Sequence, residues 1–442
     1  MLKTFPKGGV HPQENKLSEK SELKILPVSA FVSIPLLQHI GVPSTPVVNK
    51  GDKVKTGQLI AKSEGYVSSN IHSSVCGTVE KIDKITDSTG FKNKAIIIKS
   101  ETDEWLEDID KTDDIKKDIN IAPNEIINKI LAAGIVGLGG ATFPSHVKLS
   151  VPKSAKINLL VINGVECEPY LTSDYRLMLE KSEEILIGIK ILKKALNVNQ
   201  AIIGIENNKK HAIDKLNKLC KEYDGIKVQA LKVKYPQGGE KQLIKSLTKK
   251  EVPSGGLPLD VGVVCFNVGT AFAVYEAIQK NKPLIERVVT VTGKSIKKPS
   301  NYIVRIGTPV KDLIEAAGGI PENCGKIING GPMMGKAIST LEAPVVKGSS
   351  GIVIMDENES KRNDTINCIK CAKCISVCPM GLEPYLLMTL AEHEKTDKLY
   401  EKKILDCIEC GSCSFTCPSN RPLLDYIRLG KTAVNKQIKK TN

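Results

Sequence analysis

Apolar runs alternate with amphipathic segments through the middle of the chain. Short apolar runs cover 157–162, 201–205 and 228–233, and between them lie 174–196 and 208–223, where apolar residues recur every three to four positions. Short buried runs predict strands, and the longer period predicts helices. This alternation predicts an α/β core with a largely parallel sheet.

The pattern before this core is different. Short β-runs at 47–61 and 75–79, separated by Gly-Asp and Gly-Gln turns, predict an all-β module. The module resembles the barrel-sandwich fold of lipoyl and biotinyl carriers. Such a carrier needs a lysine at its exposed hairpin, and the segment 65–74 contains none. We therefore interpret the module as structural.

Two further patterns follow the core. Short apolar runs between 288 and 354, with a helical segment at 310–317, resemble a small β-grasp domain. Closer to the C-terminus, Pro384 stands at the first turn of a predicted helix over 383–394, and a second helix is predicted from Pro422 onward. The last part of the chain is therefore predicted to be mostly helical.

Composition narrows the class of protein. The 442 residues are 41% apolar and 25% charged, which is typical of soluble multi-domain chains. No apolar stretch is long enough to span a bilayer, and the first residues do not resemble a secretion signal. We therefore expect a chain that stays on the cytoplasmic side.

The formal net charge of +14 attracts a negative partner. The candidates are nucleic acid, an anionic membrane face and an acidic protein. Only 4% of residues are aromatic, and no nucleic-acid-binding motif is present. We therefore expect no nucleic-acid partner.

Eight of the thirteen cysteines lie in two identical runs, C-x-x-C-x-x-C-x-x-x-C-P. This spacing is typical of bacterial two-cluster ferredoxins, in which three thiolates come from one run and the fourth from the other. Disulfides are disfavoured in a chain without a secretion signal, and structural zinc usually takes separated C-x-x-C pairs. The runs predict two [4Fe–4S] clusters, one on Cys368, Cys371, Cys374 and Cys417, the other on Cys407, Cys410, Cys413 and Cys378.

The other five cysteines are scattered. A lone intracellular cysteine is most often a small buried hydrophobic residue. We assign no chemistry to these five, which are Cys76, Cys167, Cys220, Cys265 and Cys324.

A glycine-rich loop follows a predicted helix that begins near Pro123. Gly137, Gly139 and Gly140 let the backbone approach an anion closely, and Lys148 adds a positive charge nearby in the sequence. The loop matches neither the Walker pattern nor a Rossmann fingerprint, and many glycine loops are only turns.

Polar residues follow the first predicted strand of the core. Asn163, Glu166 and Glu168 come directly after the run 157–162, at the strand end where α/β sheets bind ligands. The segments 235–240 and 266–270 also follow strand-like runs. Taken singly, acids in such loops are solvated surface residues in most proteins.

The order of these motifs carries a resemblance. Gly-Leu-Gly-Gly-Ala-Thr-Phe-Pro at 137–144, Asn-x-x-Glu-x-Glu-Pro at 163–169, Ser-Asp-Tyr-Arg-Leu-Met at 173–178, Gly-Gly-Glu at 238–240 and Asn267 resemble the flavin- and NADH-binding subunit of respiratory complex I. Thr-Phe-Pro-Lys-Gly-Gly-Val-His-Pro at the start and the double cluster motif make the whole chain similar to the RnfC family of the Rnf ion-translocating ferredoxin:NAD oxidoreductases.

The resemblance implies cofactor-binding residues. It places a non-covalent FMN against the glycine loop and Lys148, with Asn163, Glu166 and Asn267 around its ribityl chain and ring. It places Phe143 and Glu240 toward NADH. Where this family's relative in complex I has Gly-Glu-Glu, this chain has Gly-Gly-Glu at 238–240, with one acid fewer. The complete cofactor set is Gly137, Gly139, Gly140, Phe143, Lys148, Asn163, Glu166, Gly238, Glu240 and Asn267.

The resulting fold class is a multi-domain α/β protein with an N-terminal barrel-sandwich β domain, a Rossmann-like α/β domain for FMN and NADH, a β-grasp domain and a C-terminal α-helical ferredoxin domain. We predict boundaries of 1–115 for a non-lipoylated barrel-sandwich domain, 116–286 for the FMN/NADH domain, 287–356 for the β-grasp domain and 357–442 for the double-cluster domain.

The resemblance also implies a function. It predicts a peripheral subunit of the Rnf complex that passes electrons between NAD(H) and ferredoxin through FMN and two [4Fe–4S] clusters. Membrane subunits and ferredoxin-like subunits are the expected partners, and an acidic ferredoxin is an indirect one. Two alternatives stay open: a soluble NADH-dependent oxidoreductase or diaphorase subunit without a membrane partner, and a pure electron-relay module whose glycine loop holds nothing.

Overall fold

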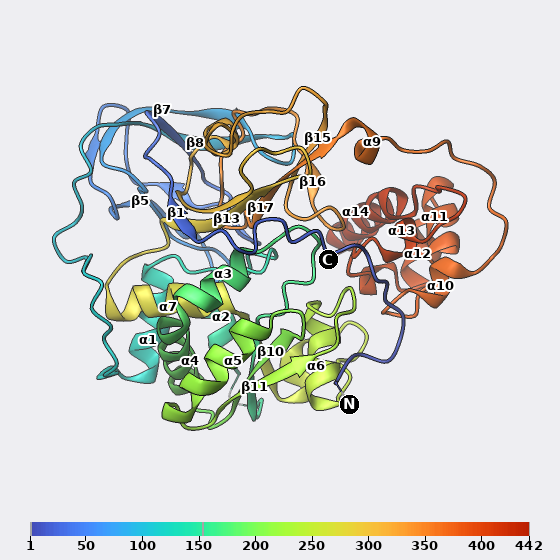
Figure 1. The fold of residues 1–442 in the computed structure, drawn as a ribbon, viewed down its shortest axis with the longest axis horizontal. Coiled ribbons are helices and arrows are strands. Elements are labelled where there is room, and N and C mark those ends of the chain that lie inside the picture. Colours follow the sequence, from blue (N-terminus) through green and yellow to red (C-terminus); the bar gives the residue numbers. More distant parts are fainter. Residues whose placement is uncertain (1, 153, 442) are drawn as a thin grey trace.

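The computed structural model describes residues 2–152 and 154–441. Met1, in the predicted first domain, and Asn442, in the predicted last domain, lie outside the described residues. Four groups of elements follow one another along the chain (Figure 1). Two β-rich groups lie beside the α/β group, and the helical C-terminal group stands at one end. No helix in the described residues is long and apolar enough to cross a membrane.

The N-terminal β module consists of two small sheets around one apolar core. Its long strands pair antiparallel, with Val79 and Ile98 facing each other in the ladder and both fully buried. The first sheet has the order β2 (Phe31–Pro35), β8 (Lys92–Ser100), β7 (Gly77–Thr86) and β4 (Lys53–Val54), and the second has β3 (Thr45–Pro46), β5 (Leu59–Lys62) and β6 (Ile71–His72).

The α/β core contains the predicted parallel sheet. Its four strands pair in the order β11 (Ile226–Leu231), β10 (Ala201–Glu206), β9 (Leu159–Asn163) and β12 (Val263–Asn267). Parallel strands buried on both faces need near-continuous apolar sequence, and this is the pattern the sequence carries. Its helices are α1 (Pro123–Ala132), α2 (Ser145–Leu149), α3 (Ser173–Glu180), α4 (Ser182–Leu196), α5 (Lys210–Leu219), α6 (Glu240–Thr248) and α7 (Val268–Gln279).

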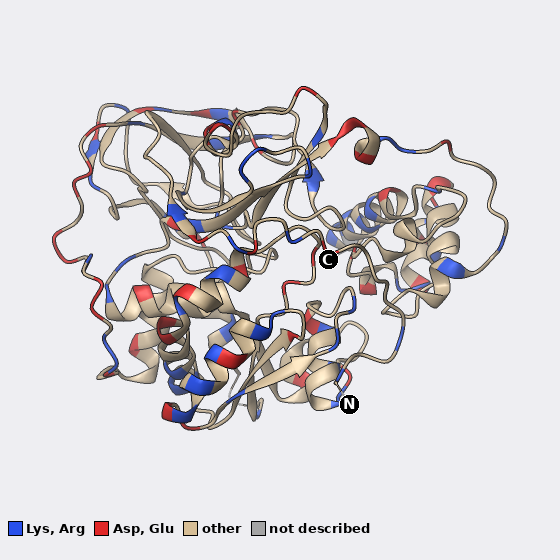
Figure 2. Ribbon diagram, in the orientation of Figure 1, with Lys and Arg blue, Asp and Glu red and all other residues tan. Residues whose placement is uncertain are grey.

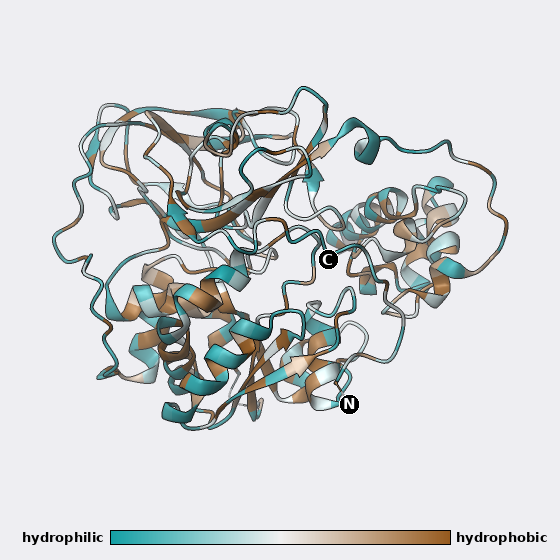
Figure 3. Ribbon diagram, in the orientation of Figure 1, coloured by the Kyte–Doolittle hydropathy of each residue, from teal (hydrophilic) through white to brown (hydrophobic). Residues whose placement is uncertain are grey.

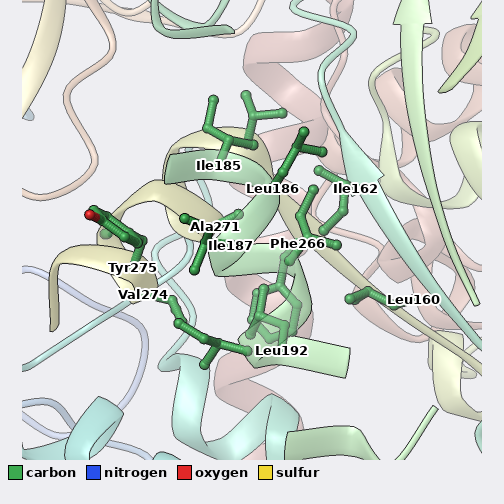
Figure 4. Close-up of a cluster of buried hydrophobic side chains, with 14 of the residues drawn as sticks. Leu160, Ile162, Ile185, Leu186, Ile187, Leu192, Phe266, Ala271, Val274 and Tyr275 are labelled. Carbon is green, nitrogen blue, oxygen red and sulfur yellow. The ribbon is translucent and has the colours of Figure 1, made fainter. Parts of the chain in front are cut away.

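Helices α4 and α7 pack closely over this sheet. Figure 4 shows Leu160 and Ile162 of β9 beside apolar side chains of both helices, among them Ile187 and Val274. A Cβ atom at Gly188 of α4 would lie 1.9 Å from the carbonyl oxygen of Ala271 in α7, so only glycine permits this approach. Figure 3 shows the same segregation, with hydrophobic residues concentrated in the strands and polar residues on outer helical faces.

The predicted helix over 174–196 is in fact two helices. Lys181 separates α3 from α4 with φ −122° and ψ 36°, outside the helical region. The Ser182 hydroxyl donates to the carbonyl oxygen of Met178 across the break. Because a one-residue interruption leaves the apolar spacing nearly intact, the periodicity did not reveal it.

The third group is a six-stranded mixed sheet with α8 (Val310–Ala316) against it. Its strand β1 (Leu23–Ile25) comes from the predicted first domain and pairs in parallel with β14. The sheet therefore includes an N-terminal segment that we predicted from the sequence to lie in the first domain. The remaining strands, in sheet order, are β14 (Ser300–Arg305), β13 (Glu286–Thr292), β17 (Gly351–Asp356), β15 (Cys324–Asn329) and β16 (Lys336–Ala337).

The C-terminal group is helical, as predicted. A short helix α9 (Glu357–Ser360) and an exposed irregular stretch precede it. The predicted helix over 383–394 is α11, and a further short helix, α12, follows it. Figure 2 shows lysines and arginines spaced along the last helix. The helices are α10 (Lys373–Ser376), α11 (Pro384–Glu392), α12 (Thr396–Glu401), α13 (Ser412–Phe415) and α14 (Leu423–Thr441).

Candidate flavin site and cluster centres

The glycine loop lies between α1 and α2. The Gly137 amide donates to the carbonyl oxygen of Phe143 at 2.8 Å and closes the loop, and the Leu138 amide donates to the Thr270 hydroxyl of α7 at 2.9 Å. Gly140 has φ +106°, and a Cβ atom there would meet nothing within 4 Å. The exposed backbone at this position therefore leaves open space for a ligand.

The carboxyl ends of two parallel strands meet beside this loop. Asn163 ends β9 and Asn267 ends β12, and the two are direct partners in the strand register. The Asn267 side chain accepts from the Gly269 amide at 2.8 Å and so caps α7. A Cβ atom on Gly139 would lie 3.3 Å from Cβ of Asn267, which brings the glycine loop and the strand end together.

Asn163 connects these strand ends to the predicted segment 235–240, which follows β11. Its Nδ2 atom donates to the carbonyl oxygen of Gly238 at 2.8 Å, and its Oδ1 atom accepts from the Val165 amide at 3.1 Å. The Gly238 amide lies 3.3 Å from the Cys167 sulfur, which accepts its hydrogen bond. The loops after β9 and β11 are therefore locked to each other.

Lys148 and Glu240 form an ion pair across the site. Nζ of Lys148 lies 2.7 Å from Oε1 of Glu240 and donates to the carbonyl oxygen of Cys265 at 2.9 Å. Burial is the largest single influence and lowers the pKa of Lys148, but the charges of Glu240 and Cys265 and the hydrogen bond to Glu240 together outweigh it, so the net pKa is raised. Lys148 thus stays cationic, and the pair joins the end of α2 to the first residue of α6.

Glu166 contacts the start of helix α3, and its expected contact with the flavin stays a prediction. Its carboxylate accepts from the amides of Asp174 at 2.7 Å and Tyr175 at 3.1 Å, and from the Ser173 hydroxyl at 3.2 Å. In the structure it therefore satisfies the free amides at the start of α3.

Asp174 is a site residue that the sequence patterns did not single out. Its Oδ2 atom accepts from Nδ2 of Asn267 at 2.6 Å. Burial first, and then the charge of Glu166, raise the pKa of Asp174, and the buried Arg287 opposes the rise. The only sequence signal was its place in the Ser-Asp-Tyr motif at 173–175, because nothing in the spacing pairs it with Asn267.

The N-terminal β module borders the glycine loop. The Ile40 amide donates to the carbonyl oxygen of Thr142 at 3.3 Å, and Nε2 of His146 lies 3.3 Å from the carbonyl oxygen of Tyr66. The buried Lys347 donates to the carbonyl oxygen of Gly134 at 2.7 Å. Phe143, which is half-buried, lies in the same loop.

Four cysteines of the C-terminal group line one cavity, and we call them the inner thiols: Cys378, Cys407, Cys410 and Cys413. Burial is the main cause that raises the pKa of Cys407 to about 11 and that of Cys413 to about 12. Neighbouring thiols add to the rise in both cases. Such thiols become thiolates readily only when a bound metal supplies positive charge, so this donor set suits a metal cluster.

Backbone amides point at two inner thiols. The Leu382 amide donates to the Cys378 sulfur and the Glu409 amide to the Cys407 sulfur, both at 3.4 Å. Amide donors of this kind tune the reduction potential of a cluster. In the described residues no three His, Cys, Asp or Glu side chains form a group that holds a single metal ion. The four sulfurs surround a cavity and do not converge on one point.

The remaining four cysteines of the two runs, which we call the outer thiols, are Cys368, Cys371, Cys374 and Cys417. Cys368 and Cys371 are exposed, and the other two are half-buried. Burial, and then the proximity of Cys417 and Cys368, raise the pKa of Cys374. Cys374 and Cys417 also pack against the buried cluster that contains the inner thiol Cys413, so the two thiol groups are neighbours.

Tyr235 joins the α/β core to the inner thiols, and the sequence patterns did not mark it as a site residue. Its hydroxyl donates to the carbonyl oxygen of Cys410 at 2.8 Å and lies 3.2 Å from Oε1 of Glu168. The other oxygen of Glu168 accepts from the Met333 amide at 3.1 Å. Burial raises the pKa of Glu168 to about 7. One junction thus unites three of the four groups of elements.

Four family models match this chain in the predicted domain order. They are the RnfC barrel sandwich hybrid domain at residues 3–103, the Nuo51 FMN-binding domain at 130–276, the SLBB domain at 288–337 and the 4Fe-4S dicluster domain at 367–421. The C subunit of the proton-translocating ferredoxin:NAD(+) oxidoreductase complex of Clostridium ljungdahlii is 48% identical over 98% of this chain and 94% of its own length.

The chain belongs to the RnfC family. The C subunit of the Na(+)-translocating complex of Acetobacterium woodii is 41% identical over 99% of this chain and 98% of its own. Membership confirms the resemblance found in the sequence motifs, and the family models confirm the fold class. As an RnfC protein, the chain contains an FMN-binding domain and a 4Fe-4S domain.

A solved structure also resembles this RnfC chain. An NAD+-reducing [NiFe]-hydrogenase in the H2-reduced state aligns with a TM-score of 0.50 and 18% identity, over 71% of this chain and 62% of the hydrogenase chain. At this identity the likeness concerns the fold alone.

The residues around the glycine loop suit an FMN. Gly140 leaves open space, and Lys148 supplies a cation on α2, the helix that follows the loop. Asn163 and Asn267 stand at adjoining strand ends, where open α/β sheets bind ligands. Which of these side chains touch the flavin stays a prediction, as do the ligands of each cluster and the domain boundaries.

Proposed function

We propose that this chain is the NAD(H)- and FMN-binding electron-transfer subunit of an ion-translocating ferredoxin:NAD oxidoreductase complex. Full-length similarity to the RnfC proteins of two such complexes supports this. The observation that carries it is the Tyr235 junction, in which a hydroxyl from the loop after β11 reaches the backbone of Cys410, one of the four thiols that line one cavity.

In this proposal the chain binds two [4Fe–4S] clusters. The inner thiols hold the cluster nearer the flavin site, since Tyr235 touches Cys410. The outer thiols hold the second, with Cys368 and Cys371 at the surface where electrons enter or leave. This order requires that the fourth ligand of each cluster come from the other run, which is the exchange typical of two-cluster ferredoxins.

The protein groups have positioning tasks. Amides of the glycine loop and the cation of Lys148 attract the flavin phosphate, and the strand-end amides orient the ribityl chain and ring. When bound, FMN takes a hydride from NADH as an electron pair and releases the electrons one at a time, which clusters accept. Glu240, Gly238 and Phe143 border the face where we place the nicotinamide. No side chain needs to act as a general acid or base.

The partners in this proposal are the other subunits of the complex, both membrane and ferredoxin-like, with an acidic ferredoxin reached indirectly. We place the chain at the cytoplasmic side of the membrane as a peripheral subunit, because its substrates NAD(H) and reduced ferredoxin are cytoplasmic. The sequence-derived alternative, a soluble diaphorase, differs only in lacking a membrane partner, and co-purification with membrane subunits in mild detergent decides between them.

The direct test uses anaerobically purified protein. We expect iron, sulfide and FMN together, with visible bleaching on addition of NADH. Lys148→Ala removes the cation of the site and is expected to lower FMN content while iron is retained. Lys190→Ala, which removes an exposed lysine of α4, is the matched control. If the wild-type protein contains its full iron but no flavin, the proposal is wrong and the chain is only an electron relay.

A further inference from the structure

The N-terminal segment 3–17, which we call the clamp, has almost no regular structure but is firmly held. In Figure 1 it is the dark blue chain that passes between the α/β core and the C-terminal helices. Phe5 is 2% exposed and Val10 is 7% exposed, although the segment forms only isolated bridges with other strands. Phe5 and Val10 are therefore the packed points of a segment whose other residues are half-buried or exposed.

One side of the clamp follows the loop after β11. The Lys232 amide donates to the carbonyl oxygen of Lys3 at 2.9 Å, and the Thr4 hydroxyl donates to Oε1 of Gln237, also at 2.9 Å. Val10 and Tyr235 exchange both backbone hydrogen bonds, at 2.8 and 2.9 Å. The clamp is thereby fixed to the residue whose hydroxyl reaches Cys410.

The other side of the clamp touches an inner thiol loop. The Gly9 amide donates to the carbonyl oxygen of Val377 at 2.8 Å. Gly8 has φ +68°, and a Cβ atom there would lie 2.6 Å from both the carbonyl carbon and the carbonyl oxygen of Cys378. The clamp backbone therefore lies directly on the backbone of the cysteine that crosses from the first run to the inner group, and only glycine fits there.

The end of the clamp is fixed to the loop after β9, which borders the strand-end site. Nζ of Lys16 donates to the carbonyl oxygens of Glu166 at 3.0 Å, Glu168 at 2.8 Å and Leu171 at 2.7 Å. The Tyr170 amide donates to the carbonyl oxygen of Glu14 at 2.8 Å. Lys16 thus fills three backbone acceptors in the loop after β9, and a buried ammonium is tolerated only when its donors are satisfied in this way.

We propose that the clamp is a positioning element for electron transfer, which sets the separation between the flavin site and the inner cluster by holding the Cys378 loop against the Tyr235 loop. This deepens the proposed function and rests on it. Electron transfer through protein slows steeply as two cofactors move apart, so a loop displacement that leaves both cofactors bound still slows the reaction.

The number of electrons transferred in each step determines which two steps are measured separately. One NADH becomes NAD+ and would deliver a hydride, which is two electrons and one proton, to the flavin. Each of the two clusters would then accept one electron, and the proton would be released to solvent. The clamp touches the path of the second step and none of the residues placed against NADH. Its perturbation is therefore expected to separate the two steps kinetically.

The test is Gly8→Ala in the full-length, anaerobically prepared protein, with iron and FMN content measured first. In stopped-flow absorption we expect the NADH-to-flavin phase to keep its rate and the flavin-to-cluster phase to slow about tenfold or more, as ångström-scale misplacement of reacting groups does elsewhere. The matched control is Gly51→Ala, because Gly51 also has positive φ, at +90°, but a Cβ atom there would meet nothing within 4 Å.

A second variant keeps the test decisive if Gly8→Ala loses iron. Lys16→Met keeps an unbranched side chain, one heavy atom shorter, and removes three hydrogen bonds that are far in sequence from the eight cysteines of the two runs. A slowed flavin-to-cluster phase at full iron and flavin content supports the clamp, and an unchanged phase overturns it. If the wild-type protein itself shows no NADH-driven bleaching, the proposed function fails instead, so the two failures are distinguishable.

Discussion

Replacing Glu166 by alanine is expected to weaken flavin binding through the start of helix α3. Its carboxylate accepts three hydrogen bonds of 2.7 to 3.2 Å at the start of α3. That helix carries Asp174, whose carboxylate holds Nδ2 of Asn267 at 2.6 Å. Loss of the cap is therefore expected to loosen Asn267, a strand-end residue of the candidate flavin site, because Asp174 links it to the helix.

The size of the effect follows from the contacts. Removing a helix cap costs about 0.5–2 kcal/mol, and hydrogen bonds to a charged group contribute about 1.5–3 kcal/mol each when fully buried. Glu166 is only half-buried, so we expect about 2 kcal/mol in total. If FMN binding must supply all of this free energy to restore the order of the site, the dissociation constant of FMN rises about thirtyfold.

Two variants separate the cap from the charge. Glu166→Gln keeps one acceptor oxygen at the helix start and is expected to weaken FMN binding about fivefold, for about 1 kcal/mol. Glu125→Ala, which removes an exposed acid from the first turn of α1, serves as the control. Flavin fluorescence titration of the cofactor-free protein gives the constants, and thermal unfolding followed by circular dichroism reports the cap. Unchanged FMN affinity and an unchanged midpoint in Glu166→Ala would refute the reasoning.

Three further outcomes are expected. Cys378→Ser removes one inner thiol, so about half of the iron is lost and one cluster signal disappears from the electron paramagnetic resonance spectrum of the reduced protein; retention of both signals contradicts the role of Cys378 as a cluster ligand. The folded-state pKa of Glu168 is about 7 against 4.5 for the free side chain, so the folded state binds more protons between these values. Its contribution to stability is full below pH 4.5 and is lost as pH rises to about 7, a slope that Glu168→Gln abolishes in cofactor-free thermal melts. Gly188→Ala forces α4 from Ala271 and lowers stability by about 1–3 kcal/mol, measured by denaturant unfolding; an unaltered midpoint rules out the tight helix contact.

Much of the architecture follows from local patterns. The strands β9, β10 and β11 lie within two residues of their predicted apolar runs, because a buried parallel strand has few sequence solutions. The single-residue break at Lys181 was missed because it preserves apolar spacing. The recruitment of β1 into the third sheet was missed because strand pairing at such sequence separation leaves no periodic signal.

The sequence alone determined the chemistry that local spacing dictates. Two C-x-x-C-x-x-C runs, each closed by Cys-Pro, place thiols on tight loops wherever those loops end up, and the glycines at 137–140 leave a backbone open to an anion in any fold. Only the tertiary structure decided which partners meet: Lys148 finds Glu240 across 92 residues, Tyr235 finds Cys410 across 175, and Gly8 lies on Cys378. These contacts depend on how whole layers pack, which no window of sequence encodes, and they join the loops of the α/β core to the loops that carry the inner thiols.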